Sequence, residues 1–441
     1  MDSVITRCAP IRASTAMNDK IKVLVFPCGS ENASEIHQAL RYSLHVELIG
    51  ASSIDDHGRF RFPRYAGGLP KIGDDTFDAV FAGLVAQHEI DVVFATHDSV
   101  HEYLSTRASR MGITLINGAV ESAAIARRKS ATYRHFADCD WVPRVYASIR
   151  DVDTWPAIVK PDLGQGGQDV TRVNDAREAA EAMQRIEQPL LVEYLPGDEV
   201  TVDCFTDRSR RLVWIGPRTR ERVKAGISMR SQLLPRSPHI AAIAQQINDG
   251  MPLRGPWFFQ LKRDRHGAWK LLEISCRVAG TMAAQRAAGI NLPLMAIQDY
   301  LGRDLIALPN PHVTLVDRNI ATRAALDWEY NTVCVDLDDT LILNGYAVPQ
   351  TIAFLYQSVA AGKQIVLLTR HAHDLARTLA AARIDAGLFD RVIVLRNGES
   401  KADHVTPRSI FIDNHFPERL DVARKCAVPV FDVDSVEFLI R

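Results

Sequence analysis

The sequence predicts an α/β protein built from more than one domain. Its 441 residues exceed the length of one ordinary domain, and 47% of them are hydrophobic, which supplies sizeable cores. Near both ends of the chain, short apolar runs rich in β-branched residues alternate with helical segments. Such alternation is typical of parallel sheets that helices cover on both faces. The middle of the chain adds two apolar runs around a polar turn, which predicts an antiparallel hairpin.

The composition gives no support for binding to nucleic acid or to a membrane. The formal net charge is −1, so neither nucleic acid nor an anionic membrane surface is an expected partner. No apolar run approaches the roughly 20 residues of a membrane span. The seven cysteines are scattered without a CxxC pair, so neither a disulfide framework nor a zinc site is indicated. A cytoplasmic location is therefore expected.

Residues 1–20 lack the apolar centre of a signal peptide and are interpreted as a loose leader. A first domain is expected at 21–120, with strands at Ile21–Phe26, His45–Gly50, Asp91–Thr96 and Ile113–Asn117 and helices at Ala33–Arg41 and Thr76–His88. Small molecules usually bind at the carboxyl ends of parallel strands. Cys28-Gly29-Ser30 and Thr96-His97-Asp98 occupy such ends, and His97 and Asp98 either contact a substrate or only form turns. There is no GxGxxG motif, so a nicotinamide site is not expected.

A second domain is expected at 121–310, and its first half carries phosphate-binding features. Lys129 lies on a helix predicted over Glu121–Ala137, whose basic face is typical of a solvated surface. The strand Ala157–Pro161 contains Lys160 and leads into the loop 162–168. Its glycines, Gly164, Gly166 and Gly167, let backbone N–H groups approach a phosphate, and the lysine supplies positive charge.

The next segments carry charged residues at strand ends. The strand Leu190–Leu195 ends in Glu193, Tyr194 and Leu195, which could offer backbone groups to an adenine, although Glu193 could equally be an ordinary strand-end acid. Further acids, Glu199 and Asp203, follow. The basic segment Gly216–Ser228 contains Arg218, Arg220, Arg222 and Lys224. These cations are either solvated or bind phosphate oxygens or an anionic substrate.

The hairpin Trp257–Arg277 turns at Asp264–Gly267, which places Gln260 opposite Glu273. Cross-strand partners point to the same face, and Ser275, two residues beyond Glu273, also points there. This face carries an amide oxygen, a carboxylate and a hydroxyl, which are the oxygen ligands that Mg²⁺ prefers. The alternative is an amphipathic hairpin whose polar face is only solvated.

Taken in order, these pieces resemble the ATP-grasp superfamily over residues 20–310, most closely its carbamoyl-phosphate synthetase and carboxylate–amine ligase branches. The resemblance implies a pre-ATP-grasp domain at 21–120 and an α+β ATP-grasp domain at 121–310, with ATP and Mg²⁺ (or Mn²⁺) as cofactors. The implied ATP ligands are Lys129, Lys160, the glycine-rich loop, Glu193, Tyr194, Leu195, Glu199 and Asp203. The implied metal ligands are Gln260, Glu273 and Ser275, and Arg277 and Arg218 are the implied catalytic cations.

This chain departs from the family pattern at two of these positions. Ser275 stands where asparagine is common, and Gln260 stands where an acid is common, so Glu273 is the main anion of the expected metal site. The implied chemistry is transfer of a phosphoryl group from ATP to a carboxylate, followed by attack of an amine on the acyl phosphate. The loop 162–168 is expected to act as a lid over the phosphates.

Residues 311–330 are polar and contain proline, which predicts a linker to a last domain at 331–441. In that domain, apolar runs again alternate with helical segments, expected at 350–361, 373–385 and 417–425. The runs end at or lead to reactive residues, namely Asp336, Thr369, Lys401 and Asp413. An acidic turn is one interpretation of Asp336-Leu-Asp338-Asp339-Thr340. The partner residues follow in an order that favours a parallel sheet with a site at its carboxyl edge.

These motifs resemble the haloacid dehalogenase superfamily, whose members are mostly phosphatases. The resemblance implies a Rossmann-like domain in which Asp336 is the nucleophile and Asp338 the general acid and base. Thr369 and Lys401 would hold the transferring phosphate, and Mg²⁺ would be bound by Asp336, Asp338 through its backbone, and Asp413. Asn414 stands where a second acid is frequent. The short gaps between the motifs leave no room for a cap domain, so the site is expected to be open.

The sequence therefore predicts a bifunctional enzyme, an ATP-dependent carboxylate–amine ligase fused to a Mg²⁺-dependent phosphatase. Its expected partners are small-molecule carboxylate and amine substrates and a phosphorylated small molecule, and homo-oligomerisation is left open. The alternatives are a synthetase that releases an acyl or carbamoyl phosphate, or a nucleotide-sensing protein without turnover. The last domain could also be a catalytically idle scaffold.

Overall fold

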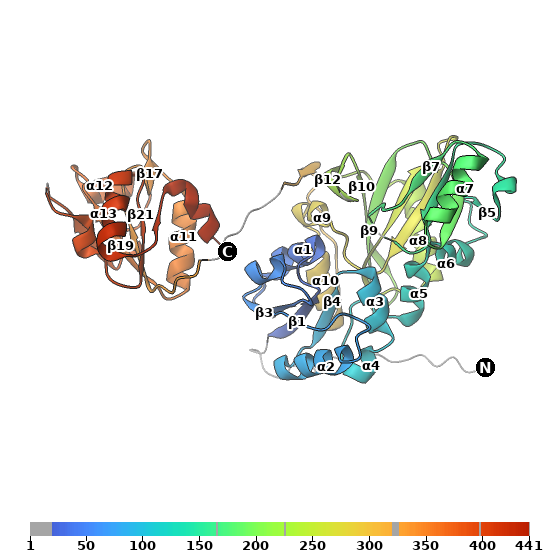
Figure 1. Ribbon diagram of the computed structural model, residues 1–441, viewed down its shortest axis with the longest axis horizontal. Coiled ribbons are helices and arrows are strands. Elements are labelled where there is room, and N and C mark those ends of the chain that lie inside the picture. Colours follow the sequence, from blue (N-terminus) through green and yellow to red (C-terminus); the bar gives the residue numbers. More distant parts are fainter. Residues whose placement is uncertain (1–19, 165, 225, 320–325, 397, 441) are drawn as a thin grey trace. The chain divides into compact units, whose positions relative to one another are not determined.

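The computed structural model describes residues 20–440, apart from residues 165, 225, 320–325 and 397 (Figure 1). The expected leader lies outside the described residues except for Lys20. The chain divides into two compact units, residues 1–319 and 320–441, and each is described by itself. Both expected N-terminal domains fall in the first unit. Among the described residues, no helix is both long and apolar enough to cross a membrane.

The first unit begins with a parallel sheet in the order β3-β2-β1-β4. Its strands are β1 (Ile21–Phe26), β2 (Val46–Ala51), β3 (Arg64–Ala66) and β4 (Val92–Ala95), and its helices are α1 (Glu31–Leu40), α2 (Phe77–His88), α3 (Asp98–Ser105) and α4 (Ala108–Met111). Alternate residues of β1 pack into two different cores, Val23 into one and Leu24 into the other. This burial on both faces explains the uninterrupted apolar runs of the sequence.

The prediction of a strand at Ile113–Asn117 is wrong. Only an isolated bridge joins Leu115 to Val93 of β4. The segment starts after Gly112 and ends at Asn117, both of which have left-handed backbone conformations. These two bends leave too little extended chain between them for a regular strand.

A second, antiparallel sheet has the order β5-β8-β6-β7, and α7 (Ala176–Arg185) packs on it. Its strands are β5 (Val145–Tyr146), β6 (Ala157–Pro161), β7 (Thr171–Val173) and β8 (Pro189–Glu193). The helix predicted over Glu121–Ala137 is instead two helices, α5 (Val120–Arg127) and α6 (Lys129–His135). Arg128 between them is extended, and the carboxylate of Asp162 accepts hydrogen bonds from the N–H and hydroxyl of Ser130. That distant carboxylate satisfies the first turn of α6, so the helix restarts there.

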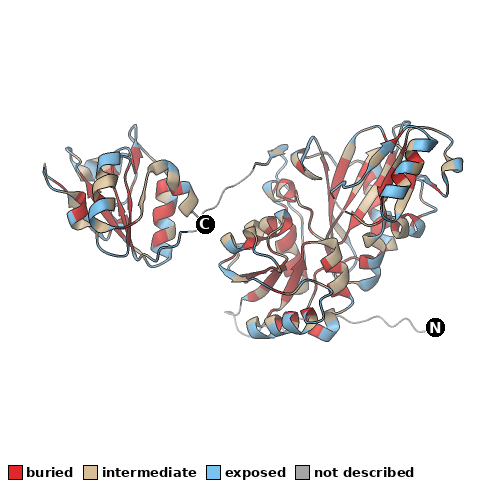
Figure 2. Cartoon of the chain, viewed as in Figure 1, coloured by how far each residue is buried: buried red, intermediate tan, exposed pale blue. Residues whose placement is uncertain are grey.

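The third sheet is antiparallel and has the order β10-β9-β13-β14. Its strands are β9 (Glu199–Thr206), β10 (Leu212–Thr219), β13 (Gly255–Arg263) and β14 (Trp269–Ser275), and α8 (Pro238–Gly250) packs on one face. Val200, Val202, Phe259 and Leu261 alternate toward that core. Figure 2 shows these strands largely buried. Period-2 alternation leaves the opposite face polar.

A small sheet, β11-β12-β15, lies beside the polar face, and two short helices complete the unit. Its strands are β11 (Arg222–Lys224), β12 (Ile227–Gln232) and β15 (Leu315–Asp317), and the helices are α9 (Ala283–Ala287) and α10 (Leu292–Tyr300). The linker was predicted at 311–330, but β15 lies within that range and belongs to the first unit, so the predicted start of the linker is too early. β15 pairs antiparallel with β12, and the next residue, Arg318, donates through its N–H to the carbonyl of Met229.

The second unit holds a five-stranded parallel sheet in the order β20-β19-β16-β21-β22. Its strands are β16 (Thr332–Val335), β19 (Gln364–Thr369), β20 (Arg391–Val394), β21 (Ser409–Ile412) and β22 (Val430–Phe431), and its helices are α11 (Pro349–Ala360), α12 (Leu375–Ala381) and α13 (Phe416–Cys426). Among the described residues, the hairpin of β17 (Ile342–Leu343) and β18 (Tyr346–Ala347) is the only regular structure between β16 and α11. No cap domain is present at that position.

Candidate functional sites

A row of polar side chains crosses the large antiparallel sheet. Gln260 on β13 pairs with Glu273 on β14 and with Thr201 on β9, and Thr201 pairs with Arg218 on β10. Directly paired residues point to the same side of a sheet, so the four residues lie on its polar face. The predicted pairing of Gln260 with Glu273 is confirmed. A register shift between Gln260 and Leu261 brings the amide opposite the carboxylate, and the two paired strands hold them side by side.

Two adjoining cavities open on this polar face, one of about 480 Å³ and one of about 330 Å³. The residues that line both are Gly166, Gln168, Arg220, Gly226, Gln260 and Glu273. The larger cavity lies toward the second sheet, which contains β6 and β8. The smaller cavity lies toward the carboxyl ends of β1 and β4. Gln260 and Glu273 therefore stand at the junction of the two cavities.

Lys160 is a buried cation in the wall of the larger cavity. Its Nζ donates to the Tyr133 hydroxyl at 2.7 Å, and that hydroxyl donates to the carbonyl of Leu272 at 2.8 Å. Burial lowers the pKa of Lys160 to about 7; the nearby Lys129 adds to this effect and Glu273 opposes it. Burial also lowers the pKa of Lys129. Among the described residues, no carboxylate bonds directly to the ammonium of Lys129 or Lys160. Two such lysines side by side favour an anionic ligand here.

The other ATP-binding residues that the sequence predicts fall into two groups. Those that line the larger cavity with Lys129 and Lys160 are Gly164, Gly166, Gly167, Glu193, Tyr194, Leu195 and Glu199. Glu193 accepts a hydrogen bond from the N–H of Arg144, and Glu199 pairs with Arg220 at 2.6 Å. Asp203 does not line this cavity. It is 1% exposed and pairs with Arg218 at 2.7 Å.

Glu273 carries the negative charge at the junction of the cavities. Burial raises the pKa of its carboxyl, while Lys129 and Arg277 oppose the rise and Asp98 adds to it. Across the described residues, no three His, Cys, Asp or Glu side chains gather as a metal cluster. A magnesium ion here would therefore take Glu273 and Gln260 as protein ligands and would need further oxygens from a phosphate or from water. The residues present fit a shared metal of that kind.

Ser275 is not placed where the predicted metal site needs it. It is 3% exposed, and its hydroxyl donates to Oδ1 of Asp98 at 2.5 Å. Asp98 also binds Arg277 Nη2 at 2.7 Å through Oδ2. Asp98 thus joins the end of the hairpin to α3 of the N-terminal sheet, and Ser275 lines neither cavity.

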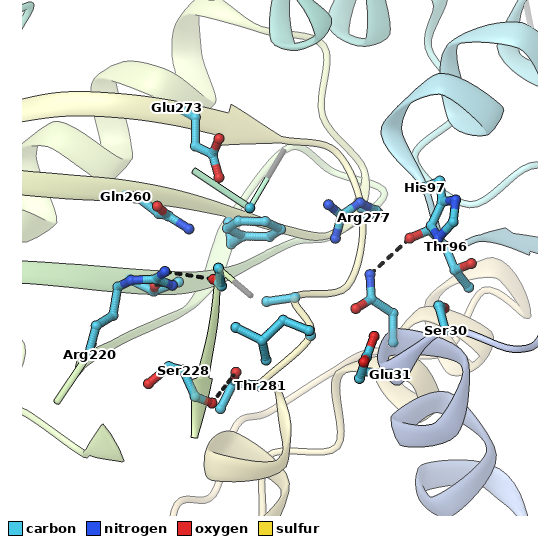
Figure 3. Close-up of a pocket in the computed structure, with 18 of the residues that line it drawn as sticks. Ser30, Glu31, Thr96, His97, Arg220, Ser228, Gln260, Glu273, Arg277 and Thr281 are labelled. Atoms are coloured by element: carbon cyan, nitrogen blue, oxygen red, sulfur yellow. Dashed lines mark hydrogen bonds between the residues drawn. The ribbon is translucent and has the colours of Figure 1, made fainter. Parts of the chain in front are cut away.

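The smaller cavity lies between the N-terminal sheet and the hairpin. Figure 3 shows Ser30, Glu31, Thr96 and His97 on one side, Gln260 and Glu273 on the other, and Arg277 between them. The predicted strand-end residues Ser30 and His97 therefore reach a cavity. Burial lowers the pKa of His97, and the Arg277 charge adds to this effect.

Sequence reasoning missed Tyr133, Asp162 and the structural role of Asp98. Tyr133 holds Lys160 in place, and Asp162 caps α6 beside Lys129. Both contacts join segments that lie far apart in the chain. No local pattern marked either residue, because an isolated tyrosine and a loop aspartate are common everywhere.

In the second unit, three predicted residues form one buried cluster. Lys401 Nζ donates to Asp336 Oδ1 and to Asp413 Oδ2, each at 2.6 Å, and all three side chains are buried. Asp336 follows β16 and Asp413 follows β21, and these two strands pair in parallel. Burial raises the pKa of Asp336 to about 6, Lys401 opposes that rise, and Asp413 adds to it.

Thr369 and Asp338 flank this cluster. Thr369 ends β19, next to β16, and its hydroxyl accepts a hydrogen bond from the N–H of His371. Asp338 is 55% exposed, and both of its carboxylate oxygens lie 3.0 Å from Nδ1 of His371. Asn414 instead bonds to Thr340. The cluster thus offers two carboxylates, an ammonium, a hydroxyl and a partly exposed acid at one sheet edge.

Comparisons with known proteins show an ATP-grasp domain in the chain. Residues 185–322 match the model of a family described as ATP-grasp in the biosynthetic pathway with Ter operon. No curated protein matches the sequence. The matched residues include the row from Arg218 to Glu273 on the large sheet.

Solved structures show the same fold at low sequence identity. The L-amino acid ligase from Bacillus licheniformis is 16% identical, over 65% of this chain and 75% of that one, with a TM-score of 0.52. N5-carboxyaminoimidazole synthetase from Staphylococcus aureus is 14% identical, over 66% and 80%, with a TM-score of 0.53. The biotin carboxylase domain of the Hydrogenobacter thermophilus 2-oxoglutarate carboxylase, in complex with MgADP, ADP and bicarbonate, is 15% identical, over 64% and 70%, with a TM-score of 0.54. The haloacid dehalogenase likeness of the second unit stays a prediction.

Proposed function

We propose that the first unit is an ATP-dependent ligase that activates a carboxylate as an acyl phosphate and joins it to an amine. The observation that carries this proposal is the pair of cavities that meet at Gln260 and Glu273. A nucleotide in the larger cavity would present its terminal phosphate at the junction, and an acid in the smaller cavity would meet it there. Reactants held on both sides of one metal-binding position need little further ordering to react.

The position of each residue in the two cavities suggests its role in the proposed reaction. Lys160, Lys129 and the glycine-rich loop bind the phosphates, and Glu193, Tyr194 and Leu195 contact the adenine. Gln260 and Glu273 would hold Mg²⁺, which neutralises charge on the phosphates. Arg277 orients the substrate carboxylate, and Asp98 holds the guanidinium of Arg277 in position. The acyl phosphate must be kept from water until the amine attacks it, and the two facing loops around Gly166 and Gly226 provide this exclusion.

The test of this proposal is ADP release by the full chain with ATP, Mg²⁺ and panels of carboxylic acids and amines. Hydroxylamine is included as a general nucleophile, because it attacks the acyl carbon of an acyl phosphate and yields a hydroxamate and phosphate. Acid-dependent ADP and an amide in the mass spectrum support a ligase. A released acyl or carbamoyl phosphate without amide would support the synthetase alternative. Nucleotide binding without any ADP would support the sensing alternative, which the engagement of Ser275 by Asp98 favours.

ATP binding is expected to take up close to one proton at pH 8. Lys160 has a pKa of about 7 and is mostly neutral at that pH. A triphosphate beside it favours the ammonium and raises its pKa. Calorimetry in buffers of different ionisation enthalpy measures the uptake, which should disappear at pH 6, where Lys160 is already charged. Lys160→Met should abolish the uptake and Lys270→Met should keep it, so equal uptake in both variants would refute the assignment.

A Gly226→Ala variant is expected to raise the KM for ATP by about 10- to 100-fold, because it misplaces the glycine-rich loop. A Cβ at Gly226 would lie 2.1 Å from the Cα of Gly166. The matched control is Gly68→Ala, since Gly68 has a similar φ of 72° against 76° but no atom within 4 Å of its Cβ position. Both changes add similar backbone strain. Steady-state kinetics on both variants should therefore separate loop contact from strain, and an unchanged KM in Gly226→Ala would exclude contact between these loops during turnover.

We also propose that the second unit is a Mg²⁺-dependent phosphatase. The observation that favours this second activity is the buried Asp336–Lys401–Asp413 cluster at the carboxyl edge of a parallel sheet. Asp336 would attack the phosphorus and form an aspartyl phosphate, which splits hydrolysis into two easier steps. Asp338, with its carboxylate partly exposed, would protonate the leaving group and then deprotonate the attacking water. Thr369 and Lys401 would hold the phosphate oxygens.

A further inference from the structure

We infer that the smaller cavity takes an acid with a second anionic group, which Arg218 binds at the end remote from the reacting carboxylate. The inference rests on the proposed ligase function and names the substrate class of that site. It is carried by two arginines that line one cavity, each of which keeps a buried nitrogen without a hydrogen-bond partner among the described residues.

The position of Arg218 follows from the sheet register. The row Glu273, Gln260, Thr201, Arg218 crosses four neighbouring strands. Strands lie about 4.8 Å apart, so the Cα of Arg218 is roughly 14 Å from that of Glu273. The reacting carboxylate belongs at the Glu273 end, where the cavities meet. With its Cα three strands away from that of Glu273, Arg218 offers a separate position for an anion in the same cavity.

The contacts of Arg218 leave it able to bind a ligand. Its side chain is 1% exposed, and its Nε donates to Oδ2 of Asp203, which also accepts from Gln285 Nε2. Its Nη1 is buried and has no hydrogen-bond partner among the described residues. A buried guanidinium nitrogen without an acceptor is costly, so an acceptor on the substrate would remove a penalty as well as add a charge-assisted hydrogen bond.

The other cations of the cavity are placed differently. Arg220 forms an ion pair with Glu199 and donates to the Thr201 hydroxyl and the carbonyl of Gly226, although its Nε makes no hydrogen bond among the described residues. Arg277 binds Asp98 through Nη2 and keeps a buried Nε without a partner. Arg277 follows β14 closely and stands at the reacting end. Spare guanidinium donors of both Arg218 and Arg277 thus belong to residues that line the cavity.

The other residues that line the smaller cavity determine where the second anionic group of the substrate binds. Glu31, at the start of α1, places a carboxylate on the N-terminal side of the cavity and repels an anion there. The hydroxyls of Ser228 and Thr281 lie on the side of the small sheet. Thr281 donates to the carbonyl of Ser228, which holds this side in place. The second acidic group, a carboxylate or a phosphate-like group, is directed to Arg218.

The test compares acids of equal chain length in the hydroxamate assay with the full chain. Glutarate is compared with valerate and adipate with hexanoate, and 3-phosphonopropionate tests a phosphate-like group that the second unit cannot hydrolyse. The two-anion acids are expected to have a kcat/KM about 10- to 100-fold higher than the matched monoacids, the range for a hydrogen bond to a charged group. Equal values for both classes would overturn the inference.

Variants locate the effect at Arg218. Because Arg218→Gln alone would leave Asp203 buried without its partner, the test variant is the double change Arg218→Gln with Asp203→Asn, checked for folding by circular dichroism. It should reduce the preference for the two-anion acid to about one. Arg222→Gln is the control, since Arg222 lies on the same segment, is half exposed and pairs with Asp317 outside both cavities. A preference that survives the double change would overturn the inference.

Calorimetric binding of glutarate and of valerate, with a Mg²⁺-loaded non-hydrolysable ATP analogue present, separates this inference from the proposed function. Tighter binding of glutarate that depends on Arg218 supports the inference even where no hydroxamate forms. Hydroxamate formation without that difference in binding refutes the inference and leaves the ligase proposal standing.

Discussion

A Glu273→Gln variant is expected to release ADP at least about 100-fold more slowly than the native chain. Glu273 is the only carboxylate among the described residues that lines both cavities, so it would be the main anion on Mg²⁺. Changes in residues that merely support a metal ligand already cost 10- to 100-fold, and removal of the ligand's own charge should cost more. Glutamine keeps the shape of the side chain. The loss should therefore appear as weaker metal dependence rather than as unfolding.

The measurement is the rate of ADP release over a wide range of Mg²⁺ concentration. High Mg²⁺ should partly restore the rate of Glu273→Gln, because its defect is in metal affinity. Glu181→Gln provides a control, since Glu181 is exposed on α7 and pairs with Arg177 of the same helix. A Glu273→Gln variant with the native rate at low Mg²⁺ would exclude the hairpin as the metal site.

An Asp336→Asn variant is expected to hydrolyse a generic phosphate ester at least about 10⁴-fold more slowly while it forms ADP at the native rate. The amide cannot attack phosphorus, and loss of the catalytic nucleophile costs about 10⁶-fold in kcat in a well-characterised serine protease. The first unit does not use Asp336, so its reaction should continue. Phosphate release from p-nitrophenyl phosphate and ADP release from ATP, measured on one preparation, test both statements.

The neighbouring Asp339 supplies the control for this change. Asp339 is exposed and has a φ of 56°, a conformation that asparagine also adopts readily. Asp339→Asn removes one negative charge from the same loop and should leave hydrolysis close to the native rate. Equal losses of ester hydrolysis in the two variants would mean that loop charge, and not a nucleophile, is required. Equal loss of both activities in Asp336→Asn would contradict two separate sites.

The hairpin is the part of the first unit that the sequence predicted best. Its turn lies at the four polar residues Asp264–Gly267, and a register shift between Gln260 and Leu261 then moves the pairing by one residue on β14. Gln260 and Glu273 pair as expected, but the irregularity that brings them opposite each other has no signal in the sequence pattern. The strand-end positions of the N-terminal sheet were predictable, because a parallel strand exposes its next residue at a shared edge. His97 and Ser30 line a cavity at that edge.

Contacts between distant segments could not be predicted. The direction of Ser275 depends on Asp98, and the availability of Arg218 depends on Asp203. Each pair joins residues whose separation in the sequence carries no periodic signal. The break between α5 and α6 has the same origin, since the cap of α6 comes from Asp162 in a different segment. Local pattern identified these residue types correctly but not the partners that orient them.

In the second unit, the order of the motifs predicted the cluster of Asp336, Lys401 and Asp413. Asp336 and Asp413 follow adjacent parallel strands, so their meeting is a consequence of sheet topology. The contact of Asp338 with His371 was not predicted. A histidine two residues beyond Thr369 has no recognisable spacing, and only the fold brings it beside the acid.

Arg318 has a consequence for where the chain can be divided. Its guanidinium donates to the carbonyl of Gly280, in the wall of the smaller cavity, and it also pairs with Glu35 of α1. Arg318, at the end of the first unit, therefore helps to hold the wall of the smaller cavity in place and is not part of an unattached linker. An N-terminal fragment that folds by itself has to extend through Arg318. A fragment that ends earlier would lose β15, which pairs with β12, and the hydrogen bond of Arg318 to Gly280 beside Thr281.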